Sequence, residues 1–210
     1  MSVATKHKRS SNLQILRIDS ATTGEQSISQ QLTEKLVQHF QEKHPDAKLV
    51  ERHLGDNPLA HINSITTKAI RTPPETHEDA VLAAYPEERA VLDEFLDSDI
   101  VIVGAPMYNF SIPSQLKAWI DRLGVPGVTF KYSESGPEGL AGGRKIVIAS
   151  ARGGTYENDS MAENQESLLK TFFGFIGIDD VHIVRVQNAG FGPDAIKEGL
   201  AKADEEIALL

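Results

Sequence analysis

Short apolar runs alternate with amphipathic segments along most of the chain, and this alternation constrains the fold more than any other feature. The run at 100–105, Ile-Val-Ile-Val-Gly-Ala, has the length and composition of a strand buried on both faces of a parallel sheet. By contrast, apolar residues recur at every fourth position from Ile28 to Phe40, as on one face of a helix. The alternation predicts an α/β fold, with a parallel sheet covered by helices on both faces.

The same reasoning places each element. We expect strands at 13–18, 48–54, 100–105, 145–149 and 181–186. We expect a first helix from Ile28 that ends at His44-Pro45, where the residue before proline avoids the helical region. We expect further helices at 74–96, 114–123, 160–175 and 193–207, with a break at Pro86 left open. Residues 55–72 are expected to be irregular, and the glycine-rich stretch 124–143 is expected to form a long insertion. By analogy with other doubly wound sheets, the five strands predict the flavodoxin-like order 2-1-3-4-5.

Composition excludes several classes of protein. The net charge of -9 argues against a nucleic-acid partner, and the absence of cysteine excludes disulfides and thiol chemistry. No apolar run approaches about 20 residues, so no membrane span is expected. The histidines show no spacing that predicts a metal site. Residues 1–12 are polar and basic without the apolar stretch of a signal peptide, which predicts a disordered tail before a single domain at 13–210 and a cytoplasmic location.

The loop at 19–27 follows the first expected strand and leads into a helix. It carries four hydroxyl side chains, one glycine and no lysine or arginine. Unpaired N–H groups and the helix dipole at such a place favour an anion such as phosphate. An ordinary helix cap by Gln26 or Ser27 is the alternative. The loop matches neither G-x-G-x-x-G nor a P-loop, so the sequence does not support a Rossmann or NTPase function.

Two further loops follow the third and fourth strands. Residues 107–110, Met-Tyr-Asn-Phe, place an amide between aromatic rings, as in an apolar slot with few polar groups, although core packing is the alternative. Residues 150–156 contain paired glycines that let a ligand approach the backbone, although an ordinary turn has the same composition. All three loops belong to one edge of the sheet. A phosphate cradle, an aromatic slot and a glycine-lined wall together indicate FMN.

Several longer motifs match one known family. They are A-P-M-Y-N-F at 105–110, S-Q-L-K at 114–117, G-V-T-F-K-Y at 127–132, G-P-E-G-L at 136–140, R-G-G at 152–154 and F-F-G-F-I-G-I at 172–178. These motifs resemble those of the FMN-dependent NADH-azoreductases, also described as NADH:quinone oxidoreductases. The similarity extends from about residue 13 to the end of the sequence.

The resemblance implies a homodimer of flavodoxin-like subunits with one FMN each, near the interface. It implies ping-pong transfer, in which NADH reduces FMN and leaves before the reduced flavin reduces a quinone or an azo compound. The implied phosphate contacts are Ser20, Gln26 and Ser27. The implied contacts with the ring are Met107, Tyr108, Asn109 and Phe110 on one side, and Ala151, Arg152, Gly153 and Gly154 at the other polar edge. A surface salt bridge is the alternative for Arg152.

Because the flavin performs the hydride chemistry, no catalytic acid or base is expected from the chain. Tyr132, Phe172 and Phe175 are candidate walls of the acceptor site, and the alternative for the two phenylalanines is the core or a dimer interface. A flavodoxin-type electron carrier or another NAD(P)H:FMN reductase is the alternative function. The long insertion argues against a carrier. A phospho-receiver module is disfavoured because the third strand ends in Gly104-Ala105-Pro106, without the required aspartate.

Overall fold

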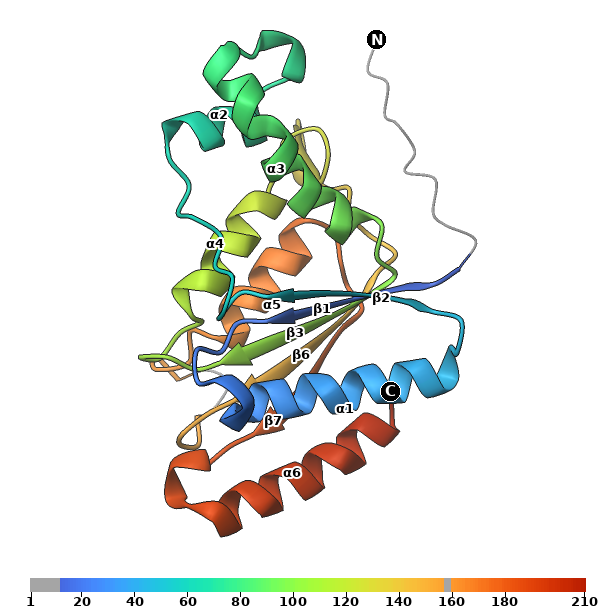
Figure 1. The fold of residues 1–210 in the computed structure, drawn as a ribbon, viewed down its shortest axis with the longest axis vertical. Coiled ribbons are helices and arrows are strands. Elements are labelled where there is room, and N and C mark those ends of the chain that lie inside the picture. The colour runs from blue at the N-terminus through green and yellow to red at the C-terminus, as the bar shows by residue number, and fades with distance from the viewer. Residues whose placement is uncertain (1–11, 157–159) are drawn as a thin grey trace.

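A computed structural model describes residues 12–156 and 160–210, and its centre is one five-stranded parallel sheet (Figure 1). The strands are β1 (Gln14–Asp19), β2 (Lys48–His53), β3 (Ile100–Pro106), β6 (Lys145–Ala151) and β7 (Val181–Val186). Their order in space is β2-β1-β3-β6-β7, which confirms the predicted order 2-1-3-4-5 of the five sheet strands.

The three inner strands end at one edge of the sheet, where β3 and β6 end level and β1 ends two residues earlier. Asp19 at the end of β1 pairs with Gly104 of β3, and Pro106 at the end of β3 pairs with Ala151 of β6. This register extends β3 and β6 by one and two residues beyond the expected strands, so Ala151 lies in the sheet and not in the following loop. Because parallel strands share one direction, the loops that follow them all leave the same edge.

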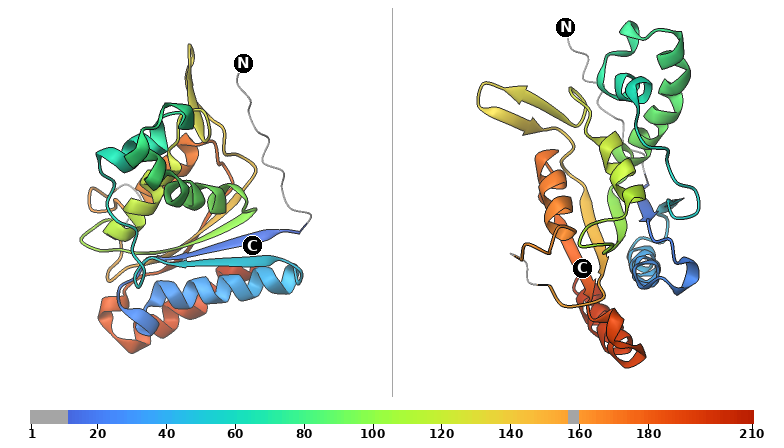
Figure 2. Two further views of the ribbon diagram at one scale, coloured as in Figure 1. Left: turned by 45° about the horizontal axis from the view of Figure 1, so that its top comes forward. Right: turned by 90° about the vertical axis from the view of Figure 1, so that its left-hand side faces the viewer.

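Helices cover both faces of the sheet (Figures 1 and 2). One face carries α1 (Ile28–Lys43) and α6 (Pro193–Ala208), and the other carries α3 (Asp79–Leu96), α4 (Ser114–Leu123) and α5 (Glu166–Phe175). Successive residues of β1 point to opposite faces, so Ile15 joins the α1 and α6 core while Leu16 joins the core under the other three helices. A strand buried on both faces needs this continuous apolar run.

The expectation of an irregular segment at 55–72 is wrong, because this segment contains α2 (Ser64–Arg71). The Asn63 side chain accepts hydrogen bonds from the N–H groups of Ile65 at 2.9 Å and Thr66 at 3.1 Å, while Thr66 Oγ1 accepts from Asn63 N–H at 2.8 Å. This capping box stabilises a helix that is rich in β-branched residues and has little propensity of its own.

The insertion at 124–143 also has more order than expected. It contains an antiparallel hairpin of β4 (Phe130–Ser133) and β5 (Gly136–Gly139), which projects from the body of the protein (Figure 2). Gly136 has φ 114°, which a residue with a side chain rarely adopts. Lys131 and Glu138 form an ion pair of 3.0 Å across the two strands.

Two helix boundaries differ from the expectation. The expected helix 74–96 is a 3-10 turn at Pro74–Thr76 followed by α3, which continues through Pro86 without a break. The expected helix 160–175 begins only at Glu166. The first helix ends at His44, next to Pro45, which confirms the expected end. Residues 1–11 of the predicted tail lie outside the described residues. Within the described ranges, no helix is long and apolar enough to cross a membrane.

Candidate functional site

The three loops at the carboxyl edge of the sheet contact one another, as expected from the sequence. The Tyr108 hydroxyl lies 3.1 Å from Thr22 N and 3.2 Å from Thr22 Oγ1, which joins the first loop to the second. Met107 N–H donates to Ala151 O at 2.8 Å, which joins the second loop to the end of β6. The Phe110 and Tyr156 rings meet edge to face, with centroids 6.3 Å apart. The edge is therefore one connected site.

The second loop is a strained turn. Asn109 has φ 47° and Phe110 has φ 70°, and the turn is closed by hydrogen bonds in both directions between Tyr108 and Ser111. Two successive left-handed residues form the type I′ geometry, which normally uses Asn-Gly. A phenylalanine at the second position is costly, and its side chain is 54% exposed. Backbone strain of this kind concentrates at ligand sites.

Four backbone donors at this edge are open. Among the residues that the structure describes, the N–H groups of Asn109, Phe110, Gly153 and Gly154 have no hydrogen-bond partner. A Cβ added to Gly153 would meet no atom within 4 Å, so space is open beside this glycine. Two rows of free donors beside open space fit a flat ring that carries hydrogen-bond acceptors along its edges.

The first loop uses two of its predicted phosphate contacts for its own structure. Ser20 is fully buried, and its hydroxyl donates to Gly104 O at 2.6 Å. Ser27 caps α1 by accepting a hydrogen bond from Gln30 N–H at 3.2 Å, which confirms the alternative stated for this residue. Gln26 is exposed. Phosphate contacts by these three side chains stay a prediction.

The start of α1 offers donors of another kind. Ile28 and Ser29 stand in its first turn, where backbone N–H groups have no acceptor within the helix. The helix contains no acidic residue in this first turn. The exposed hydroxyls of Thr22 and Thr23 lie on the loop that precedes it. An anion at this point would be bound by N–H groups, hydroxyls and the helix dipole, without a cation.

Arg152 lies beneath the third loop. It is 1% exposed, and its Nη2 lies 2.9 Å from Glu163 Oε1 and 2.7 Å from Glu166 Oε1. The sequence left open whether this guanidinium reaches the flavin or forms a surface salt bridge. The ion pairs are buried, so a surface salt bridge is wrong. A contact between Arg152 and the flavin stays a prediction.

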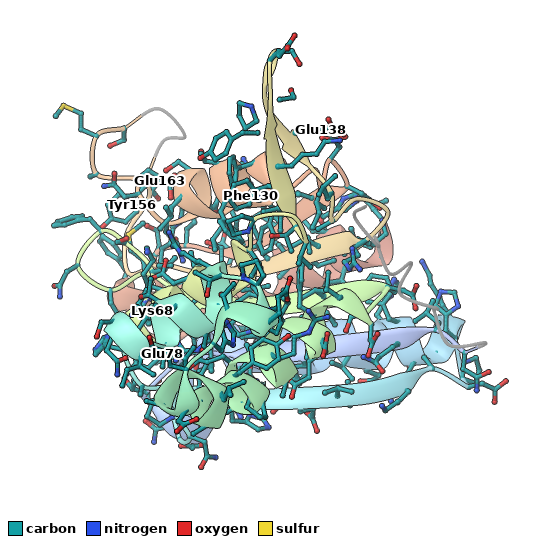
Figure 3. The ribbon with its side chains drawn as sticks, turned by 90° about the horizontal axis from the view of Figure 1, so that it is seen from above. Lys68, Glu78, Phe130, Glu138, Tyr156 and Glu163 are labelled. Atoms are coloured by element: carbon teal, nitrogen blue, oxygen red, sulfur yellow. The ribbon has the colours of Figure 1, made fainter. Side chains whose placement is uncertain are left out.

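The carboxylate of Glu163 is held in its charged form. Burial alone would raise the pKa of Glu163. The N–H groups of Glu166 and Ser167, at 2.8 and 3.0 Å, and the Arg152 cation outweigh burial, so the pKa lies below its ordinary value. Glu163 also accepts from Gln165 N–H at 3.0 Å and so satisfies the open end of α5. Figure 3 labels Glu163 and Tyr156, which both belong to this edge.

Comparison with known proteins identifies the family. Residues 14–210 match the sequence profile of a family described as having a flavodoxin-like fold. The FMN-dependent NADH:quinone oxidoreductase of Methylocella silvestris is 45% identical over 94% of this chain and 98% of its own length. The protein of the same name from Rhizobium meliloti is 46% identical over 93% of this chain and 96% of its own length. The chain belongs to the family of FMN-dependent NADH:quinone oxidoreductases.

Solved structures agree with this family. An azoreductase from Bacillus anthracis str. Sterne superposes with a TM-score of 0.82 at 28% identity and covers 94% of this chain and 98% of its own. An FMN-dependent NADH-azoreductase from Bacillus anthracis str. Ames Ancestor, solved in complex with FMN, has a TM-score of 0.80 at 24% identity, over 93% of this chain and 98% of its own. At 24% identity, the likeness to this second structure is evidence for the fold alone. The resemblance read from the motifs is confirmed.

Two of the three predicted acceptor residues, Tyr132 and Phe175, form an aromatic cluster with Phe130. Tyr132 lies on the projecting hairpin with 76% of its surface exposed, and its ring packs edge-on against Phe130. Phe175 also packs against Phe130, with centroids 4.7 Å apart, while Phe172 packs against the core and Phe173. Figure 3 labels Phe130 at the base of the hairpin that carries Glu138. Within the described residues of this one chain, no hydrogen bond or ring contact joins the three residues to loops 107–110 and 151–154.

Sequence reasoning missed several residues of the edge. Thr22 is the partner of Tyr108, and Tyr156 packs against Phe110. Glu163 and Gln165 support the third loop from below. One local signal was present, because an acidic side chain just before a helix is typical of a cap, but the expected helix start at 160 concealed it. The other residues have no local signal, since their partners are distant in sequence.

Proposed function

We propose that this protein binds FMN at the carboxyl edge of its sheet and uses NADH to reduce quinones or aromatic azo compounds. The observation that supports this function is the pair of open donor rows, at Asn109 and Phe110 and at Gly153 and Gly154, in a chain whose relatives are FMN-dependent NADH:quinone oxidoreductases. When bound, the flavin supplies an atom that accepts a hydride and later gives it up.

The chain itself binds and orients. The N–H groups of Asn109 and Phe110 bind one polar edge of the ring, and those of Gly153 and Gly154 bind the other. The N–H groups at the start of α1, with Gln26, bind the phosphate. Tyr108 and Thr22 close the passage between ring and phosphate. The remaining task of the chain is to stack donor and acceptor in turn over the same ring face, which is the ping-pong order.

A second copy of the chain completes the acceptor site in this proposal. Tyr132 stands on a projecting hairpin and exposes 76% of its surface, and Phe110 exposes 54% of its surface at the loop edge. Exposed aromatic side chains of this size are typical of interfaces and binding sites. We propose that the hairpin of one copy covers the edge of the other, which places Tyr132, and with it Phe172 and Phe175, toward the acceptor. The expected cytoplasmic location stays a prediction.

One experiment tests the function. The purified protein is titrated with FMN, and the flavin absorbance is followed anaerobically as NADH is added and then as a quinone is added. We expect saturable FMN binding, bleaching by NADH and recovery with the quinone. Failure to bind FMN, or bound FMN that NADH leaves oxidised, would contradict the proposal. Steady NADH consumption without a partner protein would exclude the electron carrier.

A further inference from the structure

Gln165 joins the ends of two strands from below the loop edge. It is fully buried at the start of α5. Its Nε2 donates to Ala105 O at the end of β3. Its Oε1 accepts from Arg152 Nε at 2.8 Å and from Ser150 Oγ at 3.3 Å, at the end of β6. One side chain therefore connects the base of loop 107–110 with the base of loop 152–156.

The partners of Gln165 require an amide. Ala105 O only accepts a hydrogen bond, and Arg152 Nε–H only donates one. The amide satisfies both, because it carries an NH₂ group and a carbonyl oxygen on one short stem. A carboxylate at this position would set an oxygen against Ala105 O. An apolar side chain would leave buried partners without hydrogen bonds.

Neighbouring carboxylates neutralise Arg152 and fix its position. Glu163 and Glu166 each contact its guanidinium, at 2.9 and 2.7 Å. Glu166 is shared with Arg185, whose Nη2 lies 2.7 Å from Glu166 Oε2. Two cations therefore face two carboxylates, and little net charge is directed toward the loop edge. Within this network, Arg152 Nε orients the Gln165 amide.

We infer that Gln165 is a positioning residue that sets the spacing between the two rows of open N–H donors. Asn109 and Phe110 follow Ala105 by four and five residues, and Gly153 and Gly154 follow Arg152 directly. A flat ring contacts both rows only when their separation matches its width. The inference rests on the proposed function for the identity of that ring, whereas the connection between the strands is a property of the chain alone.

The test compares Gln165→Leu with Gln14→Leu. Gln14 is a matched control, because it is also a buried amide, and its Nε2 donates to Ser98 Oγ at 3.2 Å, but it lies at the opposite, amino end of β1. The first measurement is hydrogen exchange of the FMN-free protein, followed at the bonded amides of Met107, Ser111 and Arg152. The second is the dissociation constant and midpoint potential of bound FMN.

We expect Gln165→Leu to accelerate exchange in both loops, to weaken FMN binding about tenfold and to shift the midpoint potential. Gln14→Leu should lower stability without these effects. Loop exchange and FMN affinity that match those of Gln14→Leu would overturn the inference. If Gln165→Leu does not fold, Gln165→Glu, which keeps the size of the side chain, takes its place. Failure of the unmodified protein to bind FMN would overturn the proposed function, while the exchange measurement would still decide whether Gln165 positions the loops.

Discussion

The hydroxyl of Tyr108 lies 3.1 Å from the backbone nitrogen of Thr22 and 3.2 Å from its side-chain oxygen, although the two residues are 86 positions apart. This contact joins the loop after β1, which holds the open start of α1, to the loop after β3, which holds the strained turn. In the proposed site it spans the space between the phosphate and the ring. The contact is also exposed, so it contributes little to the stability of the fold.

Removing the Tyr108 hydroxyl should change FMN binding without changing the stability of the fold. We expect Tyr108→Phe to weaken FMN binding about three- to tenfold, because one hydrogen bond of about 1 kcal/mol no longer holds the first loop. The melting temperature should change little. Tyr85→Phe is the control, because its ring packs against His77 and not against the first loop, so FMN affinity should stay unchanged. Equal FMN affinity in Tyr108→Phe and the unmodified protein would exclude this role.

Gly153 offers a sharper test of where the ring lies. An added methyl group meets no protein atom within 4 Å, so Gly153→Ala should fold normally. We expect it to weaken FMN binding at least about tenfold, because the methyl group occupies the space proposed for the ring. Gly174→Ala is the matched control, since that glycine of α5 also has open space around it. Calorimetric titration of both variants with FMN measures the two affinities. Equal affinities would contradict a ring position beside Gly153.

Phe110 carries strain that glycine would relieve. We expect Phe110→Gly to raise the stability of the FMN-free protein by up to about 1 kcal/mol, because Asn-Gly suits the type I′ turn and the phenylalanine is half exposed. Turnover of a quinone should fall, because the exposed ring is lost from the rim. Chemical denaturation and steady-state kinetics measure the two effects. A clear loss of stability would show that packing against Tyr156 outweighs the strain.

The buried carboxylate of Glu163 predicts a dependence on pH. Its folded pKa lies below the ordinary value of 4.5, so its charged form stabilises the fold above that pH. The contribution is lost as pH falls from 4.5 through the lower folded value. We expect Glu163→Gln to cost about 2 kcal/mol at pH 7 and less at pH 3. Urea denaturation at both pH values tests this, and an equal cost at both would contradict it.

The alternation of strands and helices could be predicted because it depends on local patterns, and the strand order was predicted by analogy with other doubly wound sheets. The apolar run of β3 and the helical spacing of α1 are each visible within a few residues. The helix α2 escaped prediction because its residues have little helix propensity, and its stability comes from the Asn63 cap and from the burial of Ala69 and Ile70. The hairpin β4–β5 escaped because its short strands are polar and largely exposed.

The candidate site was also predictable in part: its residue types and motifs were informative, and the directions of its side chains were not. The residue types of loops 107–110 and 151–154 indicated a flat cofactor, and the motifs indicated the family, both without coordinates. The direction of each side chain was beyond the sequence. Ser20 and Arg152 looked like ligands because a hydroxyl and a guanidinium suit a phosphate and a flavin, but their hydrogen bonds are made inside the protein with Gly104, Glu163 and Gln165.

Sequence alone determined the alternation of strands and helices, the edge at which the three loops meet and the family, because each of these depends on residue types in short segments. Tertiary structure decided which groups at that edge are already paired and which are open. A hydroxyl or a guanidinium can serve the ligand or the fold, and the choice depends on which buried partner lies within hydrogen-bond reach. That partner is 84 residues from Ser20 in the sequence, and no local pattern marks it.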